Sequence, residues 1–273
     1  MLNKQLTDKN IVITGATGGI GKVLALKLAE RGARLLLVGR DAERLQDLRY
    51  QCQCANHAHI HKVIVADLTT SEGLTHFRDL CADEQKIDIL INAVGVNDLS
   101  LLDAQDVKKI VNIVHTNLTV PILVCKTLLP QLKKQGSAII LNIGSTLGSI
   151  GFPGYTSYCA SKFGLRGFTE ALRRELFDTK IKVHYLSPRS VKTTMNSAAA
   201  TAMNAALKNA TDDPEVVASA AIDQMQAANG YDQFIGWPEK LFVKINHVFP
   251  AIVTQAISKQ LATIRQFALR TNP

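Results

Sequence analysis

The stretch Thr14-Gly15-Ala16-Thr17-Gly18-Gly19-Ile20-Gly21 decides the fold of this chain. It follows an apolar run, Ile11 to Ile13, and leads into an amphipathic stretch that reaches Arg31. Glycines here let the backbone turn tightly and let its amides approach a pyrophosphate, and the N-terminus of the next helix adds a favourable dipole. A glycine-rich loop alone is a weak signal, but a strand before it and a helix after it predict a dinucleotide-binding loop.

Short apolar runs alternate with helical patterns over most of the chain. The runs do not alternate with polar residues, as expected for strands of a parallel sheet covered on both faces. Repeated strand–helix alternation predicts an α/β protein with a doubly wound parallel sheet of the Rossmann type. The predicted strands are Ile11–Ile13, Leu35–Val38, Val63–Val65, Ile87–Ile91, Ala138–Ile143 and Ile181–Leu186, with a last short one at Gln233–Gly236.

The chain has no internal repeat and no low-complexity linker. We expect one catalytic domain over residues 1–236 and a C-terminal amphipathic helical extension over 237–273. Residues 196–212 are rich in Ala, Asn and Thr, and we expect them to form a substrate loop. Asp213-Pro214-Glu215 then has the residue types of a helix start.

The composition is that of a globular protein, with 47% hydrophobic and 20% charged residues over 273 positions. The five cysteines form no even framework, so reduced thiols are expected. With no visible targeting peptide and no run of ~18 apolar residues, we expect a cytoplasmic protein. The net charge is +8, but the basic residues form no continuous run and no stripe interleaved with aromatic residues. We therefore expect no nucleic-acid partner.

Further motifs follow the glycine loop in a fixed order. Tyr158 and Lys162 are four residues apart, and Ser145 lies thirteen positions before Tyr158. Together with the loop, these residues resemble the short-chain dehydrogenase/reductase family. The resemblance covers about residues 8–195 closely and extends loosely to about residue 236.

The resemblance implies a cofactor site built from four segments. The glycine loop matches the family's TGxxxGxG motif, Asp67-Leu68 its adenine-ring contact, Asn92 to Gly95 its NNAG element, and Pro188 to Thr193 its PGxxxT element. The expected cofactor contacts are Gly15, Thr17, Gly18, Gly19, Ile20, Gly21, Arg40, Asp67, Leu68, Asn92, Ala93, Gly95, Tyr158, Lys162, Pro188, Val191 and Thr193.

The resemblance also implies a catalytic set of Asn117, Ser145, Tyr158 and Lys162. Tyr158 and Lys162 share one helix face, and a nearby ammonium lowers the pKa of a phenol from its ordinary ~10. Tyr158 is then the general acid in reduction and the base in oxidation. Ser145 would hydrogen-bond the substrate carbonyl, Lys162 the nicotinamide ribose, and Asn117 a water that links Lys162 to solvent.

The end of the second predicted strand favours NADP(H) over NAD(H). An NAD site places an acid there to bind the ribose 2′-hydroxyl, whereas this chain has Gly39-Arg40. Arg40 can bind a 2′-phosphate, or it is simply a solvated charge at the end of the strand. Asp41 follows, and we expect it to cap the next helix.

Three positions depart from the family pattern, Ala93, Val94 and Arg189, and two of them limit what the resemblance implies. Ala93 replaces an asparagine that in the family mainly supports the central sheet, so a small structural change is expected. Arg189 replaces a glycine beside the nicotinamide pocket. Its side chain either reaches the cofactor phosphates or an acidic substrate group, or points into solvent at a chain bend.

Histidines and cysteines are not expected to form a site. His57, His59 and His61 alternate before the third predicted strand, but no further ligand cluster accompanies them, so no metal site is expected. Cys52 and Cys54 lack the two-residue spacing of a redox pair. All five cysteines are interpreted as structural, including Cys159 beside Tyr158.

The C-terminal extension carries an apolar stripe at helical spacing. Pro250 should kink or split this helix. From Pro238 to Pro273 there is one acid, Glu239, against five lysines and arginines, a charge of +4. The extension either packs on the protein itself or on a partner subunit, or contacts a membrane surface through 238–270. The stripe consists of Leu241/Phe242, Ile245, Val248/Phe249, Ile252/Val253, Ile257, Leu261 and Ile264.

These features predict an NADP(H)-dependent oxidoreductase that interconverts a carbonyl and an alcohol on a small, apolar molecule. A 3-oxoacyl compound and a steroid- or retinoid-like compound are both open. The alternative is a non-catalytic NADP-binding regulatory or scaffold protein. The resemblance suggests a homodimer or homotetramer, built partly on the helix of Tyr158, since Phe163, Leu165, Phe168, Leu172 and Leu176 surround more of that helix than one sheet contact requires.

Overall fold

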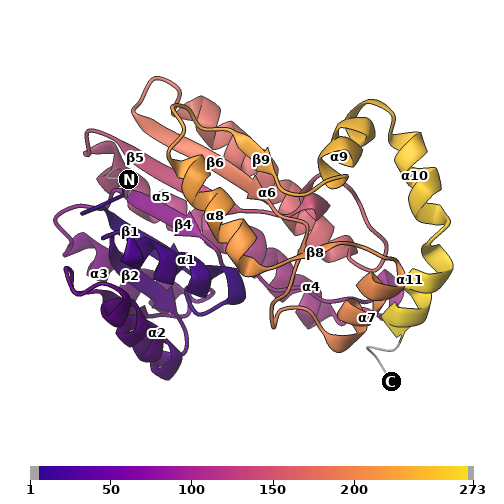
Figure 1. Ribbon diagram of the computed structural model, residues 1–273, viewed down its shortest axis with the longest axis horizontal. Coiled ribbons are helices and arrows are strands. Elements are labelled where there is room, and N and C mark those ends of the chain that lie inside the picture. The colour runs from indigo at the N-terminus through magenta and orange to yellow at the C-terminus, as the bar shows by residue number, and fades with distance from the viewer. Residues whose placement is uncertain (1–5, 270–273) are drawn as a thin grey trace.

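A seven-stranded parallel sheet forms the centre of the protein (Figure 1). The computed structural model describes residues 6–269. The strands lie in the order β3-β2-β1-β4-β5-β6-β9, so the Rossmann-type sheet predicted from the sequence is confirmed. Their bounds are β1 Asn10–Thr14, β2 Arg34–Gly39, β3 Lys62–Val65, β4 Ile89–Asn92, β5 Ala138–Ile143, β6 Ile181–Ser187 and β9 Asp232–Phe234.

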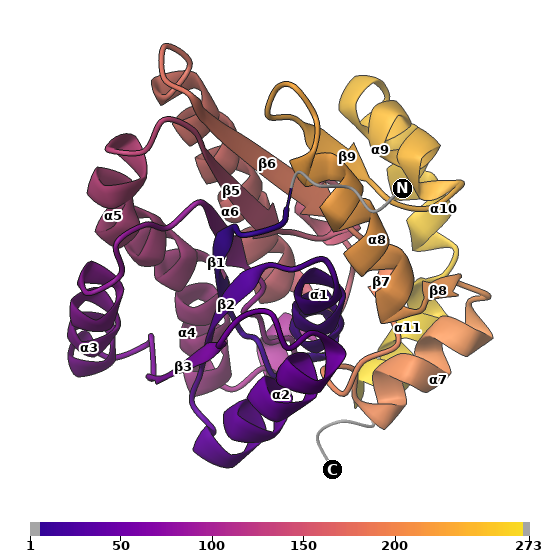
Figure 2. The ribbon, with the colours of Figure 1, turned by 60° about the vertical axis from the view of Figure 1, so that its left-hand side comes forward.

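Helices cover both faces of this sheet, so each face has its own hydrophobic core. On one face lie α1 (Gly19–Glu30), α2 (Ala42–Ala55) and α8 (Pro214–Met225). On the other lie α3 (Ser71–Ala82), α4 (Val107–Val114), α5 (Val120–Lys133) and α6 (Thr156–Glu175) (Figure 2).

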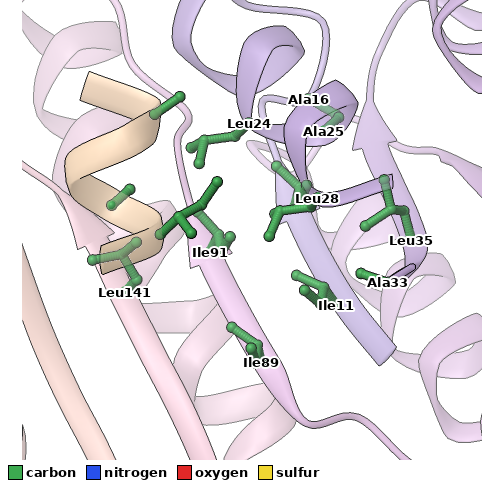
Figure 3. Close-up of a cluster of buried hydrophobic side chains, with 14 of the residues drawn as sticks. Ile11, Ala16, Leu24, Ala25, Leu28, Ala33, Leu35, Ile89, Ile91 and Leu141 are labelled. Carbon is green, nitrogen blue, oxygen red and sulfur yellow. The ribbon is translucent and has the colours of Figure 1, made fainter. Parts of the chain in front are cut away.

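The central strands are apolar throughout because their side chains alternate between these two cores. Ile11 and Ile13 of β1 enter the core beneath α1, whereas Val12 enters the opposite one. Figure 3 shows Leu24 and Leu28 of α1 among Ile11, Ile91 and neighbouring apolar side chains of the first core.

One long helical run passes along the second face. Residues 107–133 comprise α4, a π-helical turn at His115–Thr119, and α5. This run is long and apolar enough to cross a membrane by length and composition alone. Val120, Val124 and Leu128 pack in the core against the sheet, which accounts for its apolar character.

The strand order reverses between β1 and β4. Thr14, the last residue of β1, pairs with Val38 on one side and Asn92 on the other. At such a reversal the loops leaving adjacent strands diverge, and ligands bind in the resulting crevice at the carboxyl ends of the strands. The loops that follow β1, β4, β5 and β6 all start at this edge.

The segment after β6 adds a small subdomain at the same edge. Residues 196–212, predicted as a loop, include a regular helix, α7 (Ala198–Ala206), capped by the Ser197 side chain, which accepts a hydrogen bond from the amide of Ala200. Two short strands flank it, β7 (Ser190–Val191) and β8 (Thr211–Asp212). The predicted helix start at Asp213 is confirmed, since α8 begins at Pro214.

The C-terminal extension folds as three helices, α9 (Glu239–Val248), α10 (Pro250–Ser258) and α11 (Leu261–Ala268), and Pro250 splits it as predicted. It packs on its own subunit. Val243 and Val253 pack against Ile150, and Ile264 packs with Met203 of α7.

The predicted stripe of the extension is partly wrong. Val243, which is outside the stripe, is buried, whereas Leu241, Val248 and Ile252 are exposed. The break at Pro250 separates two short helices, and each turns its own face to the protein. A single helical period therefore does not describe which side chains are covered.

Candidate active site

The glycine loop is packed too tightly for a larger residue at Gly15, Gly19 and Gly21. Gly15 has φ +66°, and a Cβ there would lie 2.8 Å from the backbone of Val94. A Cβ at Gly19 would overlap the side chain of Thr193. The loop therefore lies directly against the segments that follow β4 and β6, and the N-terminus of α1, which begins at Gly19, opens beside them. Exposed first-turn amides and close backbone approach suit a pyrophosphate.

Ser145, Tyr158 and Lys162 lie together on one cavity of about 410 Å³. Ser145 follows β5 and caps a short 3-10 helix, Thr146–Gly148. Tyr158 and Lys162 lie one turn apart near the start of α6, and the Lys162 Nζ is 5.9 Å from the centroid of the Tyr158 ring. Lys162 also donates a hydrogen bond to the carbonyl of Ile143 at 3.1 Å. Three elements thus place a hydroxyl, a phenol and an ammonium at one point.

Burial is the largest influence on the pKa values of Tyr158 and Lys162 in the protein alone. It raises the pKa of Tyr158 to about 12, although a hydrogen bond with Ser145 acts in the opposite direction. Burial also lowers the pKa of Lys162 to about 8. The lowered phenol pKa expected from the sequence is therefore not produced by the side chains, because loss of hydration at Tyr158 outweighs the neighbouring amine.

Asn117 lies in the π-helical turn and is completely buried. Its side-chain amide donates to the carbonyl of Val96 at 2.9 Å and accepts from the amide of Val96 at 2.8 Å. It also donates to the Ser161 hydroxyl at 3.1 Å, which in turn donates to the carbonyl of Tyr158. The side chain therefore fixes the segment after β4 relative to the start of α6.

Asn92 belongs to a buried polar network and not to the cavity wall. Its amide nitrogen donates to Asn142 at 2.8 Å and to the Cys125 sulfur at 3.4 Å, and its oxygen accepts from Thr14 at 3.3 Å. Asn142 continues the network to Thr169 of α6. The side chain of Asn92 is thus committed to joining β1, β4 and β5, and a cofactor contact at this residue stays a prediction.

The remaining expected cofactor contacts divide between two regions. At the cavity the wall includes the expected residues Ile20, Ala93, Gly95, Pro188, Val191 and Thr193. Away from it, at the ends of β2 and β3, lie Arg40, Asp67 and Leu68. The Leu68 side chain is buried in the core on the α3 face.

Two arginines lie near the adenosine end expected from the resemblance. The Arg40 guanidinium is 71% exposed and 4.0 Å from the Asp67 carboxylate. Burial acts to raise the pKa of Asp67. The hydrogen bonds from Thr69 and the charge of Arg40 together outweigh burial, so the pKa of Asp67 lies below its usual value. Arg44 donates to the carbonyl of Thr17 at 3.0 Å, and the sequence analysis missed it. Its position in the first turn of α2, four residues after Arg40, was the available signal.

The far side of the cavity is mainly apolar. Residues from α7 and from the extension were not predicted individually, because they come from segments outside any motif. The apolar wall consists of Leu147, Ile150, Phe152, Tyr155, Met195, Met203, Phe242, Val253, Ala256 and Ile257.

Asp41 caps α2 as expected, since its side chain accepts a hydrogen bond from the amide of Arg44 at 3.0 Å.

The Arg189 side chain neither points into solvent nor extends towards the cofactor phosphates, the alternatives left open by the sequence. Its guanidinium makes two hydrogen bonds to Asp212, at 2.7 and 3.0 Å, and a third to Glu239 at 3.2 Å. A fourth goes to the carbonyl of Trp237. Arg189 therefore joins the cofactor-side segment after β6 to β8 and to the start of the extension.

The histidines and cysteines show no metal site within residues 6–269. His59 lies 2.9 Å from Asp8, and His61 accepts a hydrogen bond from the amide of Leu35. Cys159 accepts from the amide of Phe152, on a different side of α6 from the cavity. Burial raises the pKa of Cys52, Cys81 and Cys125 to about 12, which fits structural thiols.

Comparison with known proteins identifies the family. The short chain dehydrogenase family matches residues 9–204. The chain is 31% identical over 189 residues to the 3-oxoacyl-[acyl-carrier-protein] reductase of Bos taurus, covering 69% of this chain and 78% of that protein. It is also 31% identical over 186 residues to carbonyl reductase family member 4 of Danio rerio, covering 68% and 77%.

Solved structures agree with this fold. A short chain dehydrogenase from Burkholderia cenocepacia, in complex with NADP, superposes with a TM-score of 0.78 at 21% identity, over 93% of this chain and 98% of that one. Levodione reductase superposes with a TM-score of 0.74 at 21% identity, over 84% and 96%. The chain belongs to the short-chain dehydrogenase family and is an oxidoreductase.

Proposed function

We propose that this oxidoreductase is an NADP(H)-dependent carbonyl reductase or alcohol dehydrogenase with an apolar substrate. The observation that carries the proposal is the shared cavity. Ser145, Tyr158 and Lys162 meet there between the segments expected to hold the nicotinamide and a wall of apolar side chains. A carbonyl compound with an apolar body fits this arrangement of polar and apolar groups.

We infer the role of each residue from this geometry. The bound cofactor supplies the hydride. Ser145 donates a hydrogen bond to the substrate oxygen as negative charge develops there. Tyr158 donates its phenolic proton to the same oxygen, and because burial keeps its pKa near 12, it carries that proton at neutral pH. Lys162 holds positive charge beside the phenol and donates a hydrogen bond to the Ile143 carbonyl. The proton that Tyr158 gives up would return from solvent, through a water and Lys162.

Asn117 acts in this scheme as a positioning residue. It ties the segment carrying Gly95 to α6, which carries both Tyr158 and Lys162. The water expected to connect Lys162 with solvent stays part of the proposal. Both amide hydrogens of Asn117 are already donated, whereas its Oδ1 accepts one hydrogen bond and can accept a second from this water.

Arg40 and Arg44 support NADP(H) as the cofactor. The glycine cradle of the loop and the N-terminus of α1 fit the pyrophosphate, and the two guanidinium groups lie where the adenosine ribose would follow. Gly39 stands at the end of β2, where an NAD site has an acid.

Turnover decides between this proposal and a non-catalytic NADP-binding protein. The test is a screen of substrates followed by NADPH absorbance, covering 3-oxoacyl thioesters, steroids, retinal and simple aldehydes, with Tyr158→Phe as the control. Reduction of one class by the wild type and its loss in the variant are expected. Tight NADPH binding with no turnover across the screen would instead favour the scaffold function.

A homodimer or homotetramer in the cytoplasm remains our proposal for assembly and location. Val107 and Val111 of α4 are exposed, and Phe163 on the neighbouring α6 is 43% exposed. An apolar face on two adjacent helices suits a subunit contact. Light scattering of the wild type and of Val111→Glu tests it, and a monomeric wild type would contradict it.

A further inference from the structure

An exposed apolar surface covers the outer side of the first two extension helices. We call it the α9–α10 face, and in Figure 1 these helices form the margin of the molecule farthest from α2 and α3. Each side chain in it is at least 41% exposed, while Val243 and Val253 on the inner side are buried. The α9–α10 face consists of Trp237, Leu241, Phe242, Val248, Phe249 and Ile252.

Basic side chains accompany this face. Lys240 and Lys244 are exposed on α9, and Lys259 follows α10. Lys244 lies three residues after Leu241 and four before Val248, so the ammonium and the two apolar side chains are neighbours on the helix surface. Within residues 6–269 none of these three lysines has a carboxylate within salt-bridge distance.

No free acid balances these charges. Residues 240–269 contain neither Asp nor Glu. Glu239, the one acid of the extension, is held by Arg189 at 3.2 Å. The α9–α10 face is therefore apolar, aromatic and uniformly positive.

We propose that the α9–α10 face docks on an anionic lipid bilayer. Apolar and aromatic side chains enter the interface between headgroups and acyl chains, and lysines beside them bind the lipid phosphates. A second copy of this chain fits less well, since a two-fold contact would bring Lys240 and Lys244 against the same lysines of its partner with no acid between them.

Docking here also gives the active-site cavity access to lipid. Phe242 belongs to the α9–α10 face and lines the cavity, and Val253 and Ile257 continue the cavity wall behind it. This step rests on the proposed carbonyl reduction. It assigns the substrate to the lipophilic carbonyl compounds that partition into a bilayer.

The docking itself is tested without substrate or cofactor, so its result is independent of the proposed function. The full-length protein is floated with vesicles of phosphatidylcholine alone or with about one third phosphatidylglycerol. We expect it to bind the anionic vesicles at low salt and to be released by roughly half-molar NaCl, since screening weakens surface electrostatics. The double variant Lys240→Glu/Lys244→Glu should lower the partition coefficient at least tenfold.

Matched controls separate this face from the overall charge and hydrophobicity. Lys133→Glu/Lys134→Glu makes the same charge change at the end of α5, on exposed lysines. Val248→Glu/Ile252→Glu should abolish binding, whereas Ile60→Glu/Phe177→Glu, at other exposed apolar positions, should retain it.

Three results would overturn the proposal. The first is a wild type that stays with the soluble fraction at low salt. The second is equal loss of binding in the two double-lysine variants. The third is a lipid-free dimer that Val248→Glu/Ile252→Glu converts to a monomer, which would assign the α9–α10 face to a second copy.

Discussion

Tyr158 carries its proton at neutral pH in the protein alone. Burial holds the pKa of its phenol near 12, so the protein alone presents a donor at neutral pH and not a base. Reduction needs a donor, whereas alcohol oxidation needs the phenolate, which forms more readily when positive charge is added beside it. The protonation state of Tyr158 in the protein alone is therefore the one that the proposed reduction requires.

Replacing Tyr158 with Phe removes the donor and keeps the ring. We expect kcat to fall by ~10²–10⁴ with NADPH affinity nearly unchanged, because the proton transfer is lost and the cofactor contacts stay. Steady-state kinetics and NADPH fluorescence titration measure the two quantities. Tyr155→Phe is the matched control, since Tyr155 lines the same cavity. Wild-type turnover in Tyr158→Phe would exclude Tyr158 as the acid.

Arg40→Ala should weaken NADPH binding about tenfold or more and leave NADH binding nearly unchanged. A hydrogen bond to a charged group contributes ~1.5–3 kcal/mol, and ~1.4 kcal/mol corresponds to a factor of ten. Arg44→Ala should act in the same direction. The control is Arg49→Ala, at a half-buried position farther along α2 whose guanidinium donates to Gln46. A wild type that prefers NADH in kcat/KM would refute the cofactor assignment.

His184 makes the stability of the fold depend on pH. It lies in β6 with no exposed surface, and burial followed by the charges of Arg173 and Lys182 lowers its pKa to about 4. The unfolded chain binds this proton from pH ~6.5 downward, so the stability contributed by the neutral ring is complete above pH ~6.5 and is lost as the pH falls towards 4.

The variant His184→Leu should therefore lose less stability than the wild type on acidification. Between pH 7 and pH 5 the difference in unfolding free energy should move by about 1–2 kcal/mol in favour of the variant. Urea denaturation at both pH values, without cofactor, measures it. Parallel pH dependences of the two proteins would show that His184 stays charged in the fold or is not buried as described.

Sequence reasoning named the candidate active-site residues that belong to fixed local patterns. Ser145, Tyr158 and Lys162 meet because the motif spacing places them on the loop after β5 and on one face of α6. The partners of Asn92 and Arg189 could not be found this way. Asn142 lies 50 positions from Asn92, and Glu239 lies 50 positions from Arg189, and only the fold brings these pairs together.

Among the elements, the strands were predicted closely because burial on both faces leaves a continuous apolar run. Ala138–Ile143 is β5 with the same bounds. The extension was predicted less well. Helical periodicity shows which side chains share a face, but it does not show which face is covered once Pro250 has divided the helix.

Arg189 couples three of these elements, and its loss should loosen the extension. In Arg189→Gly, the residue type usual in the family, the bidentate bond to Asp212 and the bond to Glu239 both disappear. Losing roughly 1.5–3 kcal/mol of charge-assisted bonding corresponds to about a tenfold shift towards an open extension. Hydrogen exchange in α9 and α10 should speed up, and KM should rise several-fold with smaller changes in kcat and NADPH affinity.

Two further variants show whether the effect of Arg189→Gly comes from its pair with Asp212. Asp212→Asn should reproduce the effect of Arg189→Gly, because it removes the same pair from the other side. Lys192→Ala removes the exposed neighbouring pair with Asp213 and should change neither exchange nor KM. Uniform acceleration of exchange across the sheet in Arg189→Gly would mean that Arg189 stabilises the whole fold and does not position the extension.

The whole molecule combines a nucleotide-binding body with an apolar cavity wall that the extension completes. Every expected cofactor contact precedes Thr194, whereas Phe242, Val253 and Ile257 of the cavity wall follow Gly236. A chain cut after Gly236 should therefore keep NADPH binding and lose substrate affinity. It should also lose stability, because removing Val243, Val253 and Ile264 forfeits ~1.5–3 kcal/mol for each buried side chain.

NADPH titration, thermal unfolding and substrate kinetics on the truncated chain test this division. Ile264→Ala provides a milder version, since Ile264 is completely buried and its truncation should cost about 2–5 kcal/mol without removing a cavity residue. If stability alone controlled the site, Ile264→Ala and the truncated chain would lose activity in proportion to their melting temperatures. We expect instead that the truncated chain has a raised KM at an assay temperature well below its melting temperature. At that same assay temperature, Ile264→Ala should retain the KM of the wild type. An unchanged KM in the truncated chain would show that the apolar wall of the extension does not contact the substrate.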